Sequence, residues 1–176
     1  MTLSSGPEVK GFFDQDSGTI SYVVHDRSSK EAAVIDSVLD FDYASGTIGY
    51  ELADDIIGYV QAQSLNVSWH IETHVHADHL SAAPYLQDRL GGKIMISEQI
   101  TAVQKIFGKV FNAGTEFERD GSQFDRLLED GASYDLGQLT GYAIHTPGHT
   151  QACMAHGIGD AVFVGDPLFM PDGGTA

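Results

Sequence analysis

Six consecutive residues, His74-Val-His-Ala-Asp-His79, constrain this chain more than any other part of its sequence. They directly follow residues 67–73, whose β-branched and aromatic side chains predict a strand. Three of the chain's eight histidines fall in this one segment, together with an aspartate. Imidazole and carboxylate groups gathered at a strand end favour a metal site over a solvated, histidine-rich loop.

The spacing of these residues also predicts how they are arranged. Alternate side chains of an extended segment point to the same side, so we expect His74, His76 and Asp78 to converge. His79 would join them where the backbone turns into the next helix. Because no cysteine lies nearby, the pattern argues against a structural zinc site, and the ligand set suits zinc, iron or manganese.

A second candidate ligand is His149, in the segment His145-Thr-Pro-Gly-His149 at the end of a predicted strand. Pro147 and Gly148 favour a tight turn that presents His149 from a stiff loop. Taken alone, the pattern is more typical of an ordinary turn with a solvent-facing histidine. Beside the first cluster we interpret His149 as a ligand, and His145 as a strand-end residue or a hydrogen-bonding neighbour.

A third candidate is Asp166, which follows a predicted apolar strand over residues 161–164 and one glycine. A carboxylate at the end of a hydrophobic strand needs a charged or hydrogen-bonding partner, because burying an unpaired charge is costly. A metal ion is one such partner, and a role in capping the turn is the alternative.

The remaining sequence alternates between segments typical of strands and of helices. Short β-branched and aromatic runs between Asp/Ser/Gly turns predict strands, and helical spacing of apolar residues predicts helices. The predicted strands are 9–13, 19–24, 32–35, 67–73, 93–96, a piece near 134, 139–144, 152–156 and 161–164; the predicted helices are 49–64, 81–90 and 98–107. Residues 112–131 are polar and glycine-punctuated, so we expect a loop with at most one short helical turn.

We also predict the surroundings of several side chains outside these motifs. Cys153 is interpreted as a buried structural cysteine, and Trp69 and Tyr142 as core residues. The pair Phe12/Phe13 is likewise assigned to the core. Asp36 stands in an acidic segment at a strand end, where we expect a solvated loop in which Asp36 braces the metal loop.

Composition limits the class of protein. The length of 176 residues predicts a single domain, 1–176, and 42% hydrophobic residues suffice for a core. A net charge of −16 argues against binding nucleic acid or anionic membranes. One cysteine excludes an intrachain disulfide, and neither a signal peptide nor an apolar segment of ~20 residues is visible. We therefore expect a soluble, cytoplasmic protein.

Together the three motifs resemble those of the metallo-β-lactamase superfamily, whose order is H-x-H-x-D-H, a later histidine, then an aspartate after a strand. The resemblance implies an αββα sandwich with a metal site at one edge of its two sheets. The superfamily's last histidine would lie beyond Ala176, and the chain ends in a turn-like Pro171-Asp-Gly-Gly-Thr-Ala176. We therefore expect a C-terminally truncated form of the fold, whose open edge makes a homo-oligomer conceivable.

Within the superfamily, the residues in and around the three motifs are most similar to those of the glyoxalase II-like branch. Within that branch they are most similar to the persulfide dioxygenases and their bacterial β-lactamase-like relatives. That resemblance implies oxidation of glutathione persulfide to sulfite by O₂ at one Fe(II) per chain. The implied iron ligands are His74, His149 and Asp166, a two-histidine, one-carboxylate set with open positions. His76 and the pair Asp78/His79 would surround and orient these ligands.

Two alternatives remain open at this point. The first is a zinc-dependent thioester hydrolase resembling glyoxalase II, with two Zn(II) ions. One ion would be held by His74, His76 and His149. The other would be held by Asp78 and His79, with Asp166 bridging the two. The second alternative is an inactive fragment that serves only as an interaction module.

Overall fold

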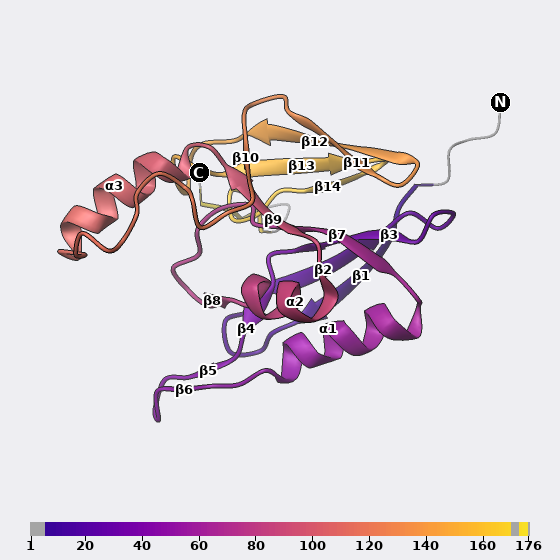
Figure 1. Cartoon of the computed structure of the whole chain (residues 1–176), viewed down its shortest axis with the longest axis horizontal. Coiled ribbons are helices and arrows are strands. Elements are labelled where there is room, and N and C mark those ends of the chain that lie inside the picture. Colours follow the sequence, from indigo (N-terminus) through magenta and orange to yellow (C-terminus); the bar gives the residue numbers. More distant parts are fainter. Residues whose placement is uncertain (1–5, 170–172, 176) are drawn as a thin grey trace.

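The computed structural model describes residues 6–169 and 173–175, which form two larger β-sheets, two two-stranded sheets (β4-β8 and β5-β6) and three helices (Figure 1). The strands are β1 (Glu8–Phe13), β2 (Ile20–His25), β3 (Glu31–Ile35), β4 (Val38–Leu39), β5 (Phe41–Asp42), β6 (Thr47–Ile48), β7 (Asn66–Ile71), β8 (Leu80–Ser81), β9 (Lys93–Ser97), β10 (Arg126–Leu128), β11 (Ser133–Leu136), β12 (Leu139–His145), β13 (Met154–Ile158) and β14 (Ala161–Phe163). The helices are α1 (Glu51–Ala62), α2 (Ala83–Leu90) and α3 (Ile100–Val110). Of the predicted tail turn, residues 171, 172 and 176 lie outside the described residues.

The larger sheet has the order β1-β2-β3-β7-β9-β10. Its first three strands form antiparallel pairs, whereas β3, β7, β9 and β10 run parallel to one another. Parallel neighbours need crossover connections, and these carry α1, α2 and α3. As a result the carboxyl ends of β3 and β7 open at one edge of the sheet, where ligand-binding loops are found in α/β folds.

The smaller sheet is an antiparallel meander in the order β11-β12-β13-β14. Because β12 and β14 both run opposite to β13, both end at the edge where β13 begins. The segments that follow β12 and β14 therefore leave the sheet on the same side.

The two sheets pack face to face, and α1 and α2 cover the outer face of the larger sheet (Figure 1). Between the sheets lies one apolar cluster that includes Ile35, Ile71 and Met154. Under the helices lies a second cluster that includes Ile56 and Leu86. These layers are helix, sheet and sheet, which are three of the four layers of the expected αββα sandwich. The described residues place no helix over the outer face of the smaller sheet.

Three sequence expectations are wrong. Residues 126–128, expected to be loop, form β10, which pairs in parallel with the edge of β9. Phe13, expected in the core, is 58% exposed, whereas Phe12 packs into the cluster under the helices. Tyr142 lies on the open face of the smaller sheet and is 53% exposed. Trp69 does pack against the core between the sheets, as expected.

Cys153 is confirmed as buried; it has no disulfide partner among the described residues. Its sulfur lies 3.1 Å from both the backbone nitrogen and the hydroxyl of Thr150, so it helps to close the loop that carries His149. None of the helices described is both long enough and apolar enough to cross a lipid bilayer.

The buried His156 of β13 predicts how stability depends on pH. Burial lowers the pKa of His156 to about 4, whereas a histidine of the unfolded chain has a pKa near ~6.5. The unfolded state therefore binds the extra proton between these two values, and the free energy of unfolding falls as pH falls through that window. We expect His156 to contribute a loss of about 2 kcal/mol between pH 7 and pH 5.

Denaturant unfolding at a series of pH values measures this loss. A His156→Gln variant cannot titrate there, so its stability should fall less steeply than that of the unaltered chain over the same range. Equal slopes for the two proteins would show that His156 is not the group responsible.

Candidate metal centre

Two neighbouring parallel strands, β3 and β7, supply one half of the site. Their last residues, Ile35 and Ile71, are paired in register, so Asp36 and Glu72 emerge side by side at the same sheet edge. The Asp36 nitrogen donates to the Ile71 carbonyl oxygen at 2.9 Å, which holds the two chain exits together. The histidine-rich segment then continues from Glu72 as irregular loop.

The smaller sheet supplies the other half. His149 lies in the loop after β12, and Asp166 lies in the turn after β14, so both come from the same edge of that sheet. The two sheet edges are joined directly, because the Met154 nitrogen donates to the Thr73 carbonyl oxygen at 2.8 Å. This bond sets the first residue of β13 against the residue that precedes His74.

His74, His149 and Asp166 come together at this junction. The Nε2 atoms of His74 and His149 lie 3.7 Å and 3.5 Å from the same Asp166 carboxylate oxygen, Oδ2. Their rings stand nearly perpendicular, at 84°, with centroids 4.9 Å apart. Because both Nε2 atoms lie within 3.7 Å of that one oxygen, a single ion among the three atoms could be bound by both rings and the carboxylate.

The triad suits a single divalent cation. His74 Nε2 is fully buried and has no hydrogen-bond partner among the described residues, which is costly unless another group satisfies it. Ligand atoms bound to one ion at about 2.1 Å stand roughly 3 to 3.5 Å apart, close to the spacings found here. The three ligand atoms lie within 4.8 Å of one another.

Two threonine hydroxyls determine which nitrogen of each histidine is free. Thr73 Oγ1 donates its proton to Asp36 Oδ2 at 2.8 Å, so it accepts from His74 Nδ1 at 3.0 Å. Thr175 Oγ1 donates to the Asp166 carbonyl oxygen at 2.8 Å and accepts from His149 Nδ1 at 2.9 Å. In both rings the proton is therefore on Nδ1, and the lone pair on Nε2 faces Asp166.

Burial favours the uncharged forms of His74 and Asp166. Burial, together with the neighbouring His76, lowers the pKa of His74 to about 4, so the His74 ring is neutral at pH 7. A neutral imidazole is the form that binds a metal. Burial also raises the pKa of Asp166, because its carboxylate loses hydration without gaining a full charge partner.

His76 is held differently from His74. Its Nε2 lies 3.1 Å from a Glu72 carboxylate oxygen and 3.3 Å from an Asp36 carboxylate oxygen. Burial alone would lower the pKa of His76, but the hydrogen bonds and charges of Asp36 and Glu72 outweigh it and raise the pKa to about 11. Asp36 thus braces the metal loop, as expected, although it is buried rather than solvated.

A second group of possible ligands consists of His76, Asp78 and His79, whose ligand atoms also lie within 4.8 Å of one another. The predicted convergence of alternate residues does not hold in detail, because the strand ends at Ile71 and the loop beyond it turns. His74 faces His149 and Asp166, while His76 stacks on His79 with ring centroids 4.2 Å apart.

Gly165 allows Asp166, the last of the candidate ligands, to approach His74. Its φ of +60° lies in the left-handed region, and a Cβ at this position would lie 2.6 Å from Thr73 Oγ1. A larger residue would push Thr73 away from His74. The Gly-Asp order noted in the sequence therefore has a steric reason.

Three residues of the site were quoted in the motifs or the tail without a role assigned to them. Thr73 and Thr175 orient the two histidines, and Glu72 holds His76. Thr73 and Glu72 directly precede His74, which was the available signal. For Thr175 no local pattern indicates a contact with His149, 26 residues earlier. His145 is confirmed as a strand-end residue, with Nε2 2.8 Å from the Gln151 carbonyl oxygen.

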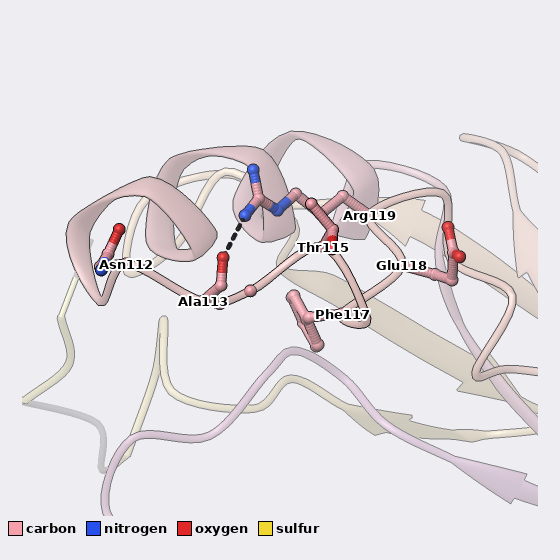
Figure 2. Close-up of a pocket in the computed structure, with 7 residues that line it drawn as sticks. Asn112, Ala113, Thr115, Phe117, Glu118 and Arg119 are labelled. Atoms are coloured by element: carbon pink, nitrogen blue, oxygen red, sulfur yellow. Dashed lines mark hydrogen bonds between the residues drawn. The ribbon is translucent and has the colours of Figure 1, made fainter.

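A cavity of about 320 Å³ adjoins the metal centre. His74 and His76 line it on one side, and Ile96 and Phe124 form part of an apolar wall. A larger cavity of about 540 Å³ lies on the loop after α3 (Figure 2). No histidine lines it, and its Arg119 donates to the Ala113 carbonyl oxygen at 2.8 Å. We assign the candidate site to the smaller cavity, because three of the candidate ligands, His74, His76 and His79, line it.

Comparison with known proteins decides the family. The sequence profile described as "Metallo-beta-lactamase superfamily" matches residues 15–176, nearly the whole chain. The chain belongs to the metallo-beta-lactamase superfamily. This confirms the expected fold, and membership supports a metal-dependent enzyme.

Relatives within the superfamily differ in their described activities. A probable metallo-hydrolase of Burkholderia pseudomallei is 56% identical over 96% of this chain, and Glyoxylase B2 of Dictyostelium discoideum is 40% identical over 99%. The chain spans 60% of the length of each of these relatives. The mitochondrial persulfide dioxygenase ETHE1 of Bos taurus is 27% identical over 92% of this chain and 53% of its own length.

Among solved structures, ETHE1 from Myxococcus xanthus superimposes with a TM-score of 0.69. It is 26% identical in sequence, and the match covers 93% of this chain and 59% of that one. The metallo-beta-lactamase superfamily architecture is therefore present across nearly all of this chain.

The triad makes a testable prediction about metal content. His149→Ala removes a ligand and should weaken divalent metal binding by more than ~100-fold, since loss of an outer partner alone costs ~10–100-fold. His79→Ala removes a group outside the triad and should cause a much smaller loss. Elemental analysis of both variants, purified without oxygen, measures the metal retained per chain. Full metal retention in His149→Ala would refute the ligand assignment.

Proposed function

We propose that this chain carries the iron site of a persulfide dioxygenase-type enzyme. The observation that carries the proposal is the convergence of His74 and His149 Nε2 on one Asp166 oxygen. This arrangement provides one complete set of two histidines and one carboxylate, the ligand set typical of non-haem Fe(II) oxygenases. The structural similarity to ETHE1 supports the same reading.

Bound at this site, Fe(II) would supply open coordination positions for a sulfur ligand and for O₂. The residues of the chain prepare that site. Thr73 and Thr175 hold the two histidine lone pairs toward Asp166, so little reorganisation is needed when the ion binds. The neutral His74 ring requires no deprotonation near pH 7.

The adjoining cavity suits the proposed substrate, a small-molecule thiol derivative such as glutathione persulfide. Its apolar wall, which includes Ile96 and Phe124, would exclude water from the sulfur, and its histidine-lined side faces the metal centre. The net reaction consumes glutathione persulfide, O₂ and water and yields glutathione and sulfite. The terminal sulfur loses four electrons, which reduce O₂.

A zinc-dependent thioester hydrolase is the second candidate. The group His76, Asp78 and His79 could hold a second ion, and His79 Nε2 is buried without a hydrogen-bond partner among the described residues. The higher sequence identity to a probable metallo-hydrolase and to Glyoxylase B2 favours it as well. Two metal ions and a bound hydroxide would then act on an acylglutathione.

One pair of assays separates these candidates. The chain, loaded anaerobically with Fe(II), is given glutathione persulfide while O₂ and sulfite are measured. The dioxygenase proposal predicts consumption of one O₂ per sulfite formed, and loss of this activity in Asp166→Ala. The chain loaded with zinc is given S-lactoylglutathione in parallel.

Hydrolysis with zinc and no O₂ consumption with iron would overturn the proposal in favour of the hydrolase. Neither activity, in a chain that is folded and holds its metal, would overturn both enzyme readings and leave an inactive fragment. Measuring metal content in the same samples shows that the site was loaded.

A further inference from the structure

We infer that the exposed face of helix α3 is a dimer interface, on which α3 of a second copy of this chain docks. Four large apolar side chains form this face, here called the α3 stripe: Ile106, Phe107, Val110 and Phe111. This role goes beyond the function proposed above and needs no metal ion.

The α3 stripe continues an apolar helix face that begins in the core. Ile100 and Val103, in the first turn of α3, are buried in an apolar cluster with Ile96 of β9. The stripe follows three, four, seven and eight residues after Val103, so it lies on the same face of the helix. There, however, α3 has passed the edge of the body, and its end projects beyond both sheets (Figure 1).

The area of the α3 stripe fits one side of a protein interface. The exposed fractions are 50% for Ile106, 49% for Phe107, 67% for Val110 and 75% for Phe111. At roughly 150–200 Å² for each fully exposed side chain, the stripe leaves on the order of 400 Å² of apolar surface in water. A standard interface buries about 800 Å² per partner, of which about 55–65% is apolar. The stripe therefore supplies most of the apolar area that one side of a stable pair requires.

This surface is held in place before any partner binds. The rings of Phe107 and Phe111 stack at 17° with centroids 5.8 Å apart. The loop after α3 closes the end of the helix, because Arg119 donates to the Ala113 carbonyl oxygen at 2.8 Å (Figure 2). Gly108 makes room for this loop, since a Cβ there would collide with Arg119. A preformed surface loses little conformational freedom when it is buried, which favours association.

The charge of the chain favours a second copy as the partner. The chain has a net charge of −16, yet α3 carries two lysines, Lys105 and Lys109, and no acidic residue. Two acidic copies can therefore approach each other at α3 with little repulsion. A basic partner would be repelled by these lysines and attracted to acidic surface elsewhere. Anionic lipid is disfavoured by the net charge of the whole chain.

The charges at the rim of the α3 stripe also complement one another. By helical spacing, Lys105 and Lys109 lie along one side of the stripe. Glu116 and Glu118 are exposed on the loop that packs along the other side of the helix, at Gly108. A two-fold axis along the paired helices sets the lysines of one copy opposite the glutamates of the other. This relation occurs twice in the pair, as a closed interface between identical copies requires.

Sedimentation at a series of chain concentrations measures the pairing. We expect a dimer that dissociates reversibly on dilution from ~100 μM, and no larger species, because this interface closes at two copies. Phe111→Glu places a charge in the stripe and should raise the dimer Kd by more than ~10-fold. Val162→Glu is the matched control: it adds the same charge at a 61% exposed residue of β14, the edge strand of the smaller sheet. It should change the Kd by less than ~2-fold.

An exchange of charges tests whether the partner is a second copy. The double variants Lys105→Glu/Lys109→Glu and Glu116→Lys/Glu118→Lys each place like charges opposite one another. Each should raise the dimer Kd by ~10-fold or more. An equimolar mixture of the two variants should recover a dimer made of one copy of each. Adding Phe111→Glu to either variant should abolish that recovery, because general attraction between the two variants does not need the stripe.

A chain that sediments as a monomer at ~100 μM would overturn the inference, since a micromolar pair is formed at that concentration. A dimer that Phe111→Glu leaves intact, or that Val162→Glu disrupts, would overturn it too, because the copies would then meet elsewhere. Failure of the mixed variants to pair would overturn the docking of α3 on α3. Circular dichroism shows that each variant is folded, and Val110→Glu repeats the test at a second exposed position if Phe111→Glu does not fold.

Discussion

The buried carboxylate of Asp36 is the interaction on which the rest of the site depends. It accepts hydrogen bonds from the Thr73 nitrogen and hydroxyl and lies 3.3 Å from His76 Nε2. Its backbone has a φ of +49°, a conformation that non-glycine residues rarely adopt and that aspartate tolerates better than most. The Ser21 hydroxyl, which donates to its carbonyl oxygen, helps to hold this conformation.

Asp36 acts on the candidate ligand His74 through the hydroxyl of Thr73. Asp36 takes the proton of the Thr73 hydroxyl, which obliges Thr73 to accept from His74 Nδ1 and leaves Nε2 free. Burial opposes the charge on Asp36, but hydrogen bonds from His76 and Thr73 outweigh it and keep the pKa of Asp36 below its usual value. A charged carboxylate at the base of the site therefore sets both the tautomer of one histidine and the position of another.

Much of the fold could be predicted because local signals and tertiary packing agree. The helix from Glu51 to Ala62 follows the predicted apolar spacing, and Ile56 and Val60 are buried under it. The β10 strand could not be predicted, since its three residues are strand only because the edge of β9 pairs with them. Tyr142 was misplaced because alternation along β12 does not reveal whether a second layer covers the outer face.

The candidate ligands were found in the sequence because His74, His149 and Asp166 each stand at a predicted strand end. Their partners were harder to find. Thr175 contacts His149 across 26 residues, and the contacts of Glu72 with Ser81 and His76 are seen only in the folded chain. Hydrogen bonds between distant segments leave no periodicity in a sequence.

By itself the sequence determined the family, the order of strands and helices and the residues able to bind metal, because these depend on local composition and spacing. The tertiary structure alone decided which of the possible ligands lie close to one another. Parallel pairing of β3 with β7 places Asp36 beside Glu72, and the meander of the smaller sheet returns His149 and Asp166 to one edge. Only that juxtaposition shows that the His74 lone pair is free while His76 is engaged by carboxylates. The physical reason is that the lone pair of a histidine is assigned by its hydrogen-bond partners, and here those partners come from other strands.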